Sequence, residues 1–154
     1  MHIAVVNGPN LNLLGVREPG RYGTTTLGEI EASVRARARE LKVDISWLQS
    51  NHEGELIEAV QALRGRADGA LINAAAFTHT SLALRDAVLA AEMPFVEVHL
   101  TNIWSREEER RKSLLADLAV GVVAGFGPQS YLLGLDGLVG WLRGAAQAPK
   151  SVQV

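Results

Sequence analysis

Short apolar runs alternate with longer amphipathic segments along the chain, and this alternation restricts the fold more than any other feature. Five runs, mostly rich in β-branched residues, have the length of buried strands: His2 to Val6, Val43 to Leu48, Ala70 to Ile72, Phe95 to Leu100 and Val120 to Val123. Apolar residues recur at helical spacing in four other segments: Leu27 to Leu41, Leu56 to Leu63, Leu84 to Ala91 and Tyr131 to Leu142. Repeated units of this kind predict one parallel sheet with helices on both faces.

We therefore expect an α/β fold, most simply a flavodoxin-like three-layer sandwich around a five-stranded parallel sheet. A single catalytic domain over residues 1–143 and a flexible tail over residues 144–154, which is small and polar, are expected. Capping-box spacing predicts three helix starts: Thr26 with Glu29, Ser50 with Glu53, and Ser105 with Glu108.

Composition narrows the range of partners and of chemistry. The 154 residues carry a net charge of −2 with scattered Lys and Arg, so no nucleic-acid or membrane-binding face is expected and a small-molecule partner is favoured. With no Cys, disulfides, thiolate catalysis and Cys-based metal sites are excluded. The chain has no apolar run near the roughly 18 residues of a membrane span and no signal-peptide pattern, which predicts a cytoplasmic protein.

The stretch from Asn7 to Gly23 is long for the connection between a strand and a helix, which usually takes about 2 to 6 residues. It mixes Gly and Pro with groups that hold anions or move protons, namely Asn10, Arg17 and Tyr22. We interpret it as a binding loop, with a polar surface loop as the alternative.

Polar residues also follow the third and fourth predicted strands, at the edge where ligands bind in open α/β sheets. Glu97 and His99 are two residues apart, so both side chains leave the same face of a strand and the carboxylate can orient the imidazole. The alternative is a buried pair of structural use alone. His79 lies in a Thr-His-Thr-Ser stretch that opens a helix, where backbone N–H groups favour an anion, although capping would explain the hydroxyls equally well.

Arg106 and Arg110 are four residues apart on a predicted helical segment, so both can approach one carboxylate. Taken alone, this run is explained better as an exposed charge run with local ion pairs. No metal site is expected, because the four His show no paired spacing, and the glycines form neither a dinucleotide fingerprint nor a phosphate loop. Cofactor-free acid–base chemistry is what remains.

Several motifs, in one order along nearly the whole chain, resemble those of the type II 3-dehydroquinate dehydratases, also called type II 3-dehydroquinases. They are Asn7-Gly-Pro-Asn-Leu-Asn-Leu-Leu-Gly, Arg17-Glu-Pro, Tyr22-Gly, Gln49-Ser-Asn-His-Glu-Gly-Glu-Leu, Asn73 with Thr78-His-Thr-Ser-Leu-Ala-Leu-Arg-Asp86, Glu97-Val-His99-Leu, and Arg106-Glu-Glu with Arg110. The resemblance implies dehydration of 3-dehydroquinate to 3-dehydroshikimate without a cofactor, in the shikimate pathway or in quinate catabolism. It also implies a homo-oligomer, a dodecamer built of trimers.

The resemblance further implies a role for each matching residue. Tyr22 would be the base, His99 the acid, Glu97 its orienting partner, Arg17 a residue of the mobile lid, and Asn10 the holder of a water that stabilises the enolate. Substrate would be held by Asn73, His79, Thr101, Asn102, Ile103, Arg106 and Arg110, with Asp86 arriving from a neighbouring subunit.

Four residues depart from the family pattern, namely Ala75, Thr101, Glu109 and Lys112. Ala75 stands where Gly is usual, and its Cβ would disfavour a positive φ or crowd the ligand. A non-catalytic flavodoxin-like module that binds an anion or serves regulation is the alternative function.

Overall fold

The computed structural model describes residues 1–16, 20 and 23–147. Its sheet has five parallel strands in the order β2-β1-β3-β4-β5. The strands are β1 (His2–Asn7), β2 (Asp44–Gln49), β3 (Gly69–Asn73), β4 (Phe95–His99) and β5 (Gly121–Ala124). The predicted flavodoxin-like arrangement is confirmed, and β1 and β3 mark the point where the strand order reverses.

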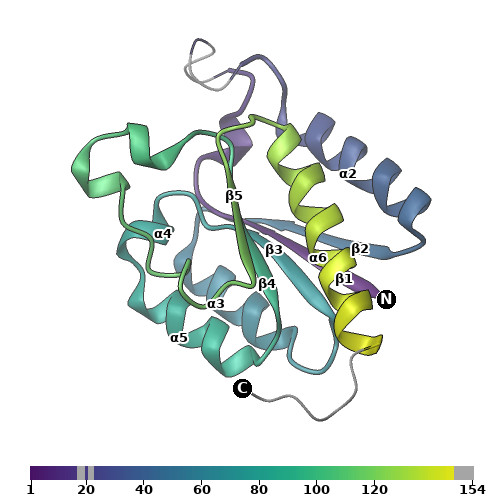
Figure 1. Ribbon diagram of the computed structural model, residues 1–154. Coiled ribbons are helices and arrows are strands. Elements are labelled where there is room, and N and C mark those ends of the chain that lie inside the picture. The colour runs from purple at the N-terminus through teal and green to yellow at the C-terminus, as the bar shows by residue number, and fades with distance from the viewer. Residues whose placement is uncertain (17–19, 21–22, 148–154) are drawn as a thin grey trace.

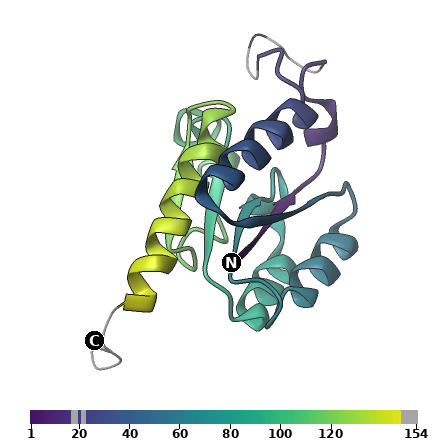
Figure 2. The ribbon, with the colours of Figure 1, turned by 90° about the vertical axis from the view of Figure 1, so that its right-hand side faces the viewer.

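Helices cover both faces of this sheet (Figures 1 and 2). One face carries α2 (Leu27–Leu41) and α6 (Gln129–Gln147). The other carries α3 (Glu53–Ala62), the single turn α4 (Phe77–Thr80) and α5 (Leu82–Ala91). The start of α2 is the predicted capping box: the Thr26 side chain accepts from the Glu29 N–H, and the Glu29 carboxylate accepts from the Thr26 N–H.

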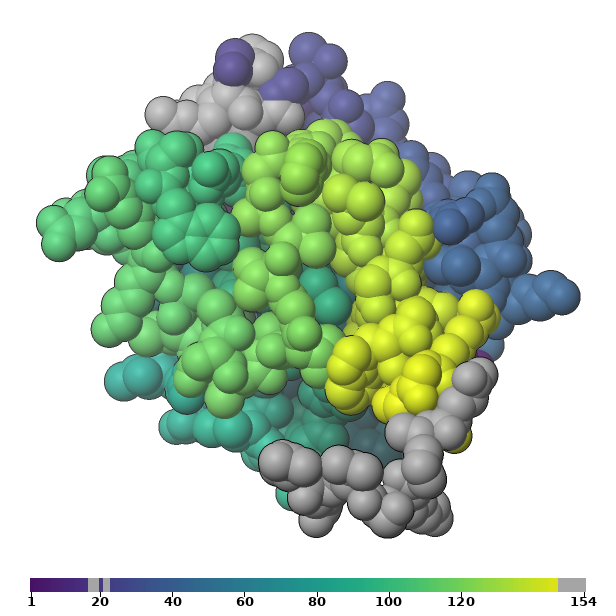
Figure 3. Space-filling view, viewed as in Figure 1, coloured from purple at the N-terminus to yellow at the C-terminus, as the bar shows by residue number. Residues whose placement is uncertain are grey.

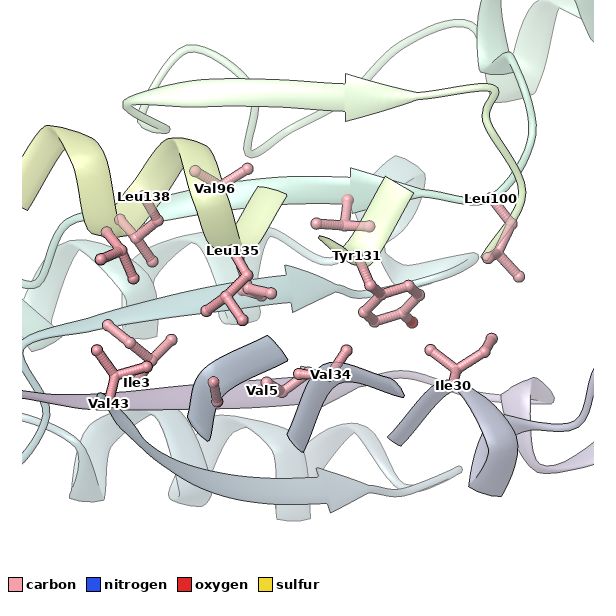
Figure 4. Packing of buried hydrophobic residues seen from close by; sticks show 14 of the residues in the cluster. Ile3, Val5, Ile30, Val34, Val43, Val96, Leu100, Tyr131, Leu135 and Leu138 are labelled. Atoms are coloured by element: carbon pink, nitrogen blue, oxygen red, sulfur yellow. The ribbon is translucent and has the colours of Figure 1, made fainter. Parts of the chain in front are cut away.

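Each face of the sheet has its own apolar core, because successive residues of a buried strand point to opposite faces. Ile3 and Val5 point to α2 and α6, whereas Ala4 and Val6 point to α3 and α5. Figure 4 shows the first of these cores, in which Tyr131 of α6 lies nearer to the carboxyl ends of the strands than Leu135 and Leu138 do. Tyr131 is fully buried and stacks on Trp47 with ring centroids 6.0 Å apart.

Two of the predicted helix starts are wrong. His52 precedes α3, and Ser50 instead donates to Glu55 and accepts from the His52 N–H. Between β4 and β5 the described chain forms two 3-10 turns, η2 (Ile103–Ser105) and η3 (Glu108–Arg110), and no α-helix. Ser105 ends η2, so the predicted helix through Arg106 and Arg110 is absent.

Because the described segment between β4 and β5 forms no α-helix, β5 lies at the surface beside α6 (Figure 3). At the other end of the domain, α6 runs past residue 143 to Gln147, into the segment predicted as a tail, and residues 148–154 lie outside the described part. None of the described helices is long and apolar enough to cross a membrane.

Candidate active site

A cavity opens at the carboxyl ends of β1, β3 and β4, next to the point where the strand order reverses. Three segments line it: the turn after β1, which includes η1 (Leu11–Leu13), the turn after β3, and the segment after β4. Eight of the predicted site residues lie in its wall: Asn10, Asn73, His79, His99, Thr101, Ile103, Arg106 and Arg110.

The other predicted site residues lie elsewhere. Glu97 lies behind His99, fully buried. Asn102 is exposed, and its side chain accepts from the Trp104 N–H at the start of η2 instead of lining the cavity. Asp86 lies exposed on α5, outside the cavity of its own chain. Arg17 and Tyr22 fall outside the described residues.

The Glu97 carboxylate orients the His99 ring. Its Oε1 lies 2.8 Å from Nε2 of His99, and it also accepts hydrogen bonds from Thr78 at 2.7 Å and Ser113 at 2.8 Å. Burial raises the pKa of Glu97, but the hydrogen bonds from His99, Thr78 and Ser113 outweigh it and hold the pKa below its ordinary value. With Glu97 ionised, Nε2 of His99 donates to it, and Nδ1 is the nitrogen that gains and loses the second proton.

His79 faces the same cavity from the turn before α5. Its Nδ1 donates to the carbonyl of Lys112 at 2.7 Å, which fixes the tautomer of the neutral ring. Burial lowers the pKa of His79, with smaller contributions in the same direction from His99 and Arg110, so the ring is neutral near pH 7. A neutral imidazole with one nitrogen already used is suited to hold a ligand through the other.

Arg106 and Arg110 both line the cavity, although Arg106 directly follows η2 and Arg110 is the last residue of η3. Glu107 lies between them: it forms an ion pair with Arg110 and its Oε2 lies 3.6 Å from Nε of Arg106. The local ion pair that the charge run suggested is therefore present, and both arginines also line the cavity. Two cations at one wall favour an anionic ligand.

The turn after β1 is anchored to neighbouring strand ends. The Asn10 N–H donates to Oδ1 of Asn51 at 2.8 Å, and Gln49 donates to the same oxygen at 3.2 Å. Gly8 passes so close to β3 that a Cβ there would lie 2.3 Å from the Ala74 carbonyl oxygen. Only glycine permits that approach, which brings Asn10 to the cavity wall.

A continuous hydrogen-bond chain runs beneath the turn after β3. The Ala75 N–H donates to Oδ1 of Asn73 at 3.2 Å, and Nδ2 of Asn73 donates to the Tyr131 hydroxyl at 2.8 Å. Tyr131 in turn donates to Oδ1 of Asn7 at 2.7 Å. Ala75 has a φ of +50°, the left-handed conformation that its Gly-like position in the sequence motif requires.

The sequence did not reveal the residues that hydrogen-bond to Glu97 and Asn73 from outside the cavity. Thr78 belongs to a quoted motif but was interpreted only as part of a helix start, while Ser113 lies in a segment with no recognisable pattern. Tyr131 was assigned to the apolar face of a helix. Its hydroxyl was the available signal, because a buried Tyr needs a hydrogen-bond partner.

Together the fold and the site define a class of protein. A buried carboxylate that holds an imidazole, in a cavity lined by two arginines and two asparagines, is typical of an α/β enzyme that binds a small anion and moves a proton.

Comparison with known proteins identifies the family. A family model described as "Dehydroquinase class II" matches residues 1–139. The 3-dehydroquinate dehydratase of Synechococcus sp. (strain WH7803) is 57% identical over 144 residues, which are 94% of this chain and 98% of the relative. The crystal structure of type II dehydroquinase from Butyrivibrio crossotus DSM 2876 superposes with a TM-score of 0.86 at 36% identity, over 90% of this chain and 97% of that one. The crystal structure of the Propionibacterium acnes type II dehydroquinase gives the same TM-score of 0.86 at 37% identity, over 90% and 96% of the two chains. This chain belongs to the class II dehydroquinase family.

Proposed function

We propose that this chain removes water from 3-dehydroquinate to give 3-dehydroshikimate, using His99 as the acid and Tyr22 as the base. As a member of the family it is a type II hydro-lyase of the shikimate pathway. The observation that carries the assignment of the acid is the Glu97–His99 pair at the wall of a cavity that Arg106 and Arg110 also line.

The reaction divides into two proton transfers. Tyr22 removes the proton from the carbon between the ketone and the carbon that bears the hydroxyl group, and the electron pair of the C–H bond enters an enolate. Asn10 holds a water that stabilises the enolate oxygen. The enolate then forms the C=C bond as the C–O bond breaks, and His99 gives its proton to the departing hydroxyl, which leaves as water. The substrate loses one H and one OH, so no oxidant or reductant is required.

Binding of the substrate carboxylate and hydroxyls is assigned to polar groups at the end of β3, in the turn after it, and in the segment after β4. The cavity wall supplies Asn73, His79 and Arg110, with Thr101 and the backbone near Ile103 beside them. Neutral His79 supplies a nitrogen without adding charge, whereas Arg110 supplies the positive charge for the carboxylate.

The roles of Tyr22 and Arg17 rest on the resemblance. A free Tyr has a pKa of about 10, so a phenolate near pH 7 needs neighbouring cations. Arg17 on the same loop and Arg110 in the cavity wall are suited to that task. Closure of the loop over an anionic substrate would exclude water and strengthen these interactions.

Assembly and location complete the proposal. A trimer-based dodecamer would bring Asp86 of one subunit to the cavity of the next, and its exposed place on α5 suits such a contact. Sedimentation decides this point, because full activity in a monomeric sample would contradict it. We place the reaction in the cytoplasm, which fractionation of the source cells would test.

The test of the function mixes purified protein with 3-dehydroquinate, with and without a chelator, and follows the ultraviolet absorbance of the conjugated enone in 3-dehydroshikimate. Enone formation that the chelator leaves unchanged is the expected result. Absence of product from a folded oligomer would overturn the proposal and favour a module that binds an anion without catalysis.

A further inference from the structure

We infer that Tyr131 is a positioning residue for substrate binding, acting through Asn73 at a distance from the ligand. The inference rests on the proposed function, since it concerns how the cavity holds 3-dehydroquinate. Tyr131 lies on α6, far from every motif of the site in the sequence, and it does not line the cavity. Its hydroxyl nevertheless joins two residues that end neighbouring strands.

The geometry gives the hydroxyl a defined direction. Asn7 and Asn73 are direct partners in the register of β1 and β3; Asn73 lines the cavity, whereas Asn7 does not. Tyr131 accepts from Nδ2 of Asn73 at 2.8 Å and donates to Oδ1 of Asn7 at 2.7 Å. A single hydroxyl has one hydrogen, so one amide must face Tyr131 with an N–H and the other with its oxygen.

The series of hydrogen bonds ends on a backbone group at each side. Nδ2 of Asn7 donates to the carbonyl of Leu48 at 3.0 Å, and Oδ1 of Asn73 accepts from the Ala75 N–H at 3.2 Å. Every donor along the series points the same way, from Ala75 through Asn73, Tyr131 and Asn7 to Leu48, and such series strengthen each member. Neither amide can reverse without breaking contacts on both sides.

The consequence reaches the cavity through Asn73. Asn73 lines the wall, the hydrogen-bond series uses one N–H and one lone pair of its amide, and the series therefore sets where the second N–H and lone pair point. Burial raises the pKa of Tyr131, so the hydroxyl stays neutral and keeps its hydrogen throughout the pH range of ordinary assays. Tyr131 therefore serves orientation and takes no part in proton transfer.

Replacement by Phe removes the hydroxyl while leaving the ring, its burial and its stacking on Trp47. Asn73 then loses the acceptor that holds its amide and samples other orientations. Because Asn73 is assigned to binding, we expect Tyr131→Phe to raise KM about tenfold and to change kcat by less than about threefold.

A double-mutant cycle with Asn73→Ala separates positioning from general structural support. In the Asn73→Ala background, Tyr131→Phe is expected to change KM by less than about twofold, because the group that it orients is gone. An equal effect of Tyr131→Phe in both backgrounds would overturn the inference. So would an unchanged KM in the single Tyr131→Phe variant, or in Asn73→Ala.

The matched control is Val34→Ala, which removes buried side-chain volume from the same core cluster without touching the hydrogen-bond series. It should lower the melting temperature while leaving KM unchanged; a similar rise in KM would show that loss of stability alone explains the Tyr131→Phe result. If Tyr131→Phe does not fold, Asn7→Ala takes its place in the cycle, since it removes the acceptor on the other side of the hydroxyl. The wild-type assay comes first: without wild-type turnover the proposed function itself fails, whereas the cycle is judged against an active wild type.

Discussion

Oε1 of Glu97 and Nε2 of His99 lie 2.8 Å apart at the end of β4, with the carboxylate wholly closed to solvent and the imidazole in the cavity wall. An ionised carboxylate in that place accepts a hydrogen bond from Nε2 and fixes the orientation of the ring. The pair is thus built to deliver a proton in one direction.

Glu97→Gln tests this relationship. A neutral amide cannot stabilise the imidazolium, so we expect kcat to fall by about 10²-fold, the lower end of what a general acid contributes. Steady-state kinetics with circular dichroism, to show that the variant is folded, provides the measurement. Glu92→Gln on the exposed end of α5 is the control and should retain kcat. A folded Glu97→Gln variant with wild-type kcat would mean that the pair has a structural role only.

Ser113→Ala tests how far the stability of the protein depends on the charge of the Glu97 carboxylate. Ser113 donates to both oxygens of Glu97, at 2.8 and 2.9 Å, and its loss should cost about 2 kcal/mol near pH 7, as for other hydrogen bonds to charged groups. The pKa of Glu97 is lowered in the folded protein, so this stabilisation is present above the unfolded pKa near 4.5 and is lost as pH falls through the folded value.

Urea unfolding at pH 7 and at successively lower pH values below 4.5 would follow that loss. The difference between wild type and Ser113→Ala should shrink as the pH falls. Ser33→Ala, whose hydroxyl donates to the carbonyl of Glu29 on α2, should show a small difference that does not vary with pH. The Ser113 hydroxyl also accepts hydrogen bonds from the N–H groups of Leu115 and Ala116. If the difference in unfolding free energy between wild type and Ser113→Ala stayed constant across the pH range, the whole effect would be due to those two bonds.

Ala75 is the departure from the family pattern that the structure makes testable. Its φ of +50° costs an L-residue about 1 to 2 kcal/mol, whereas glycine would avoid that strain and lose about 0.5 to 1 kcal/mol through its greater freedom when unfolded. Ala75→Gly should therefore leave the free energy of unfolding unchanged or raise it by up to about 1.5 kcal/mol.

Ala75→Val should destabilise by about 2 kcal/mol or more, because a β-branched residue tolerates this conformation poorly, and should raise KM by crowding the cavity. Thermal unfolding and steady-state kinetics measure the two effects. Ala76→Val is the matched control, since Ala76 lines the same cavity with an ordinary φ of −63° and should affect KM without the same loss of stability. Equal losses of stability at both positions would show that strain at Ala75 is not the cause.

Tyr22→Phe tests the assigned base. The variant keeps the ring but has no ionisable hydroxyl, so it should bind substrate with near wild-type affinity and show no turnover. Isothermal calorimetry measures the affinity, and the enone absorbance measures turnover. Tyr131→Phe, the only other Tyr→Phe change that the chain allows, is expected to retain kcat. Surviving turnover in Tyr22→Phe would show that another group takes the proton.

The parts of the fold that were predictable from sequence are those governed by local patterns. β1, β3 and β4 were identified because strands buried on both faces give mostly apolar runs, and α2 was identified from its spacing and from Thr26 with Glu29. The cavity followed from the rule that ligands bind beyond strand ends, which placed Asn73 and His99 together although they are far apart in sequence.

The failures have a common physical origin. The connection between β4 and β5 carries helix-forming residues, but its shape is set by bonds to other segments, such as Ser113 to Glu97 and the Leu114 N–H to the Thr78 carbonyl. Ser50 has the spacing of a cap, yet Glu55 and the His52 N–H take up its hydroxyl. Tertiary partners overrode local preference in both places, and no local pattern reveals such partners.

The position of Tyr131 near the end of the sequence has a consequence for a newly made chain. Every residue assigned to chemistry or binding, from Asn10 to Arg110, leaves the ribosome before Tyr131 does. A nascent chain that ends before Tyr131 holds all the reactive groups, but it lacks the hydroxyl that links the side chains of Asn7 and Asn73. Docking of the final helix thus supplies the last contact to an amide assigned to substrate binding, so KM during refolding is expected to report that docking rather than the formation of the sheet.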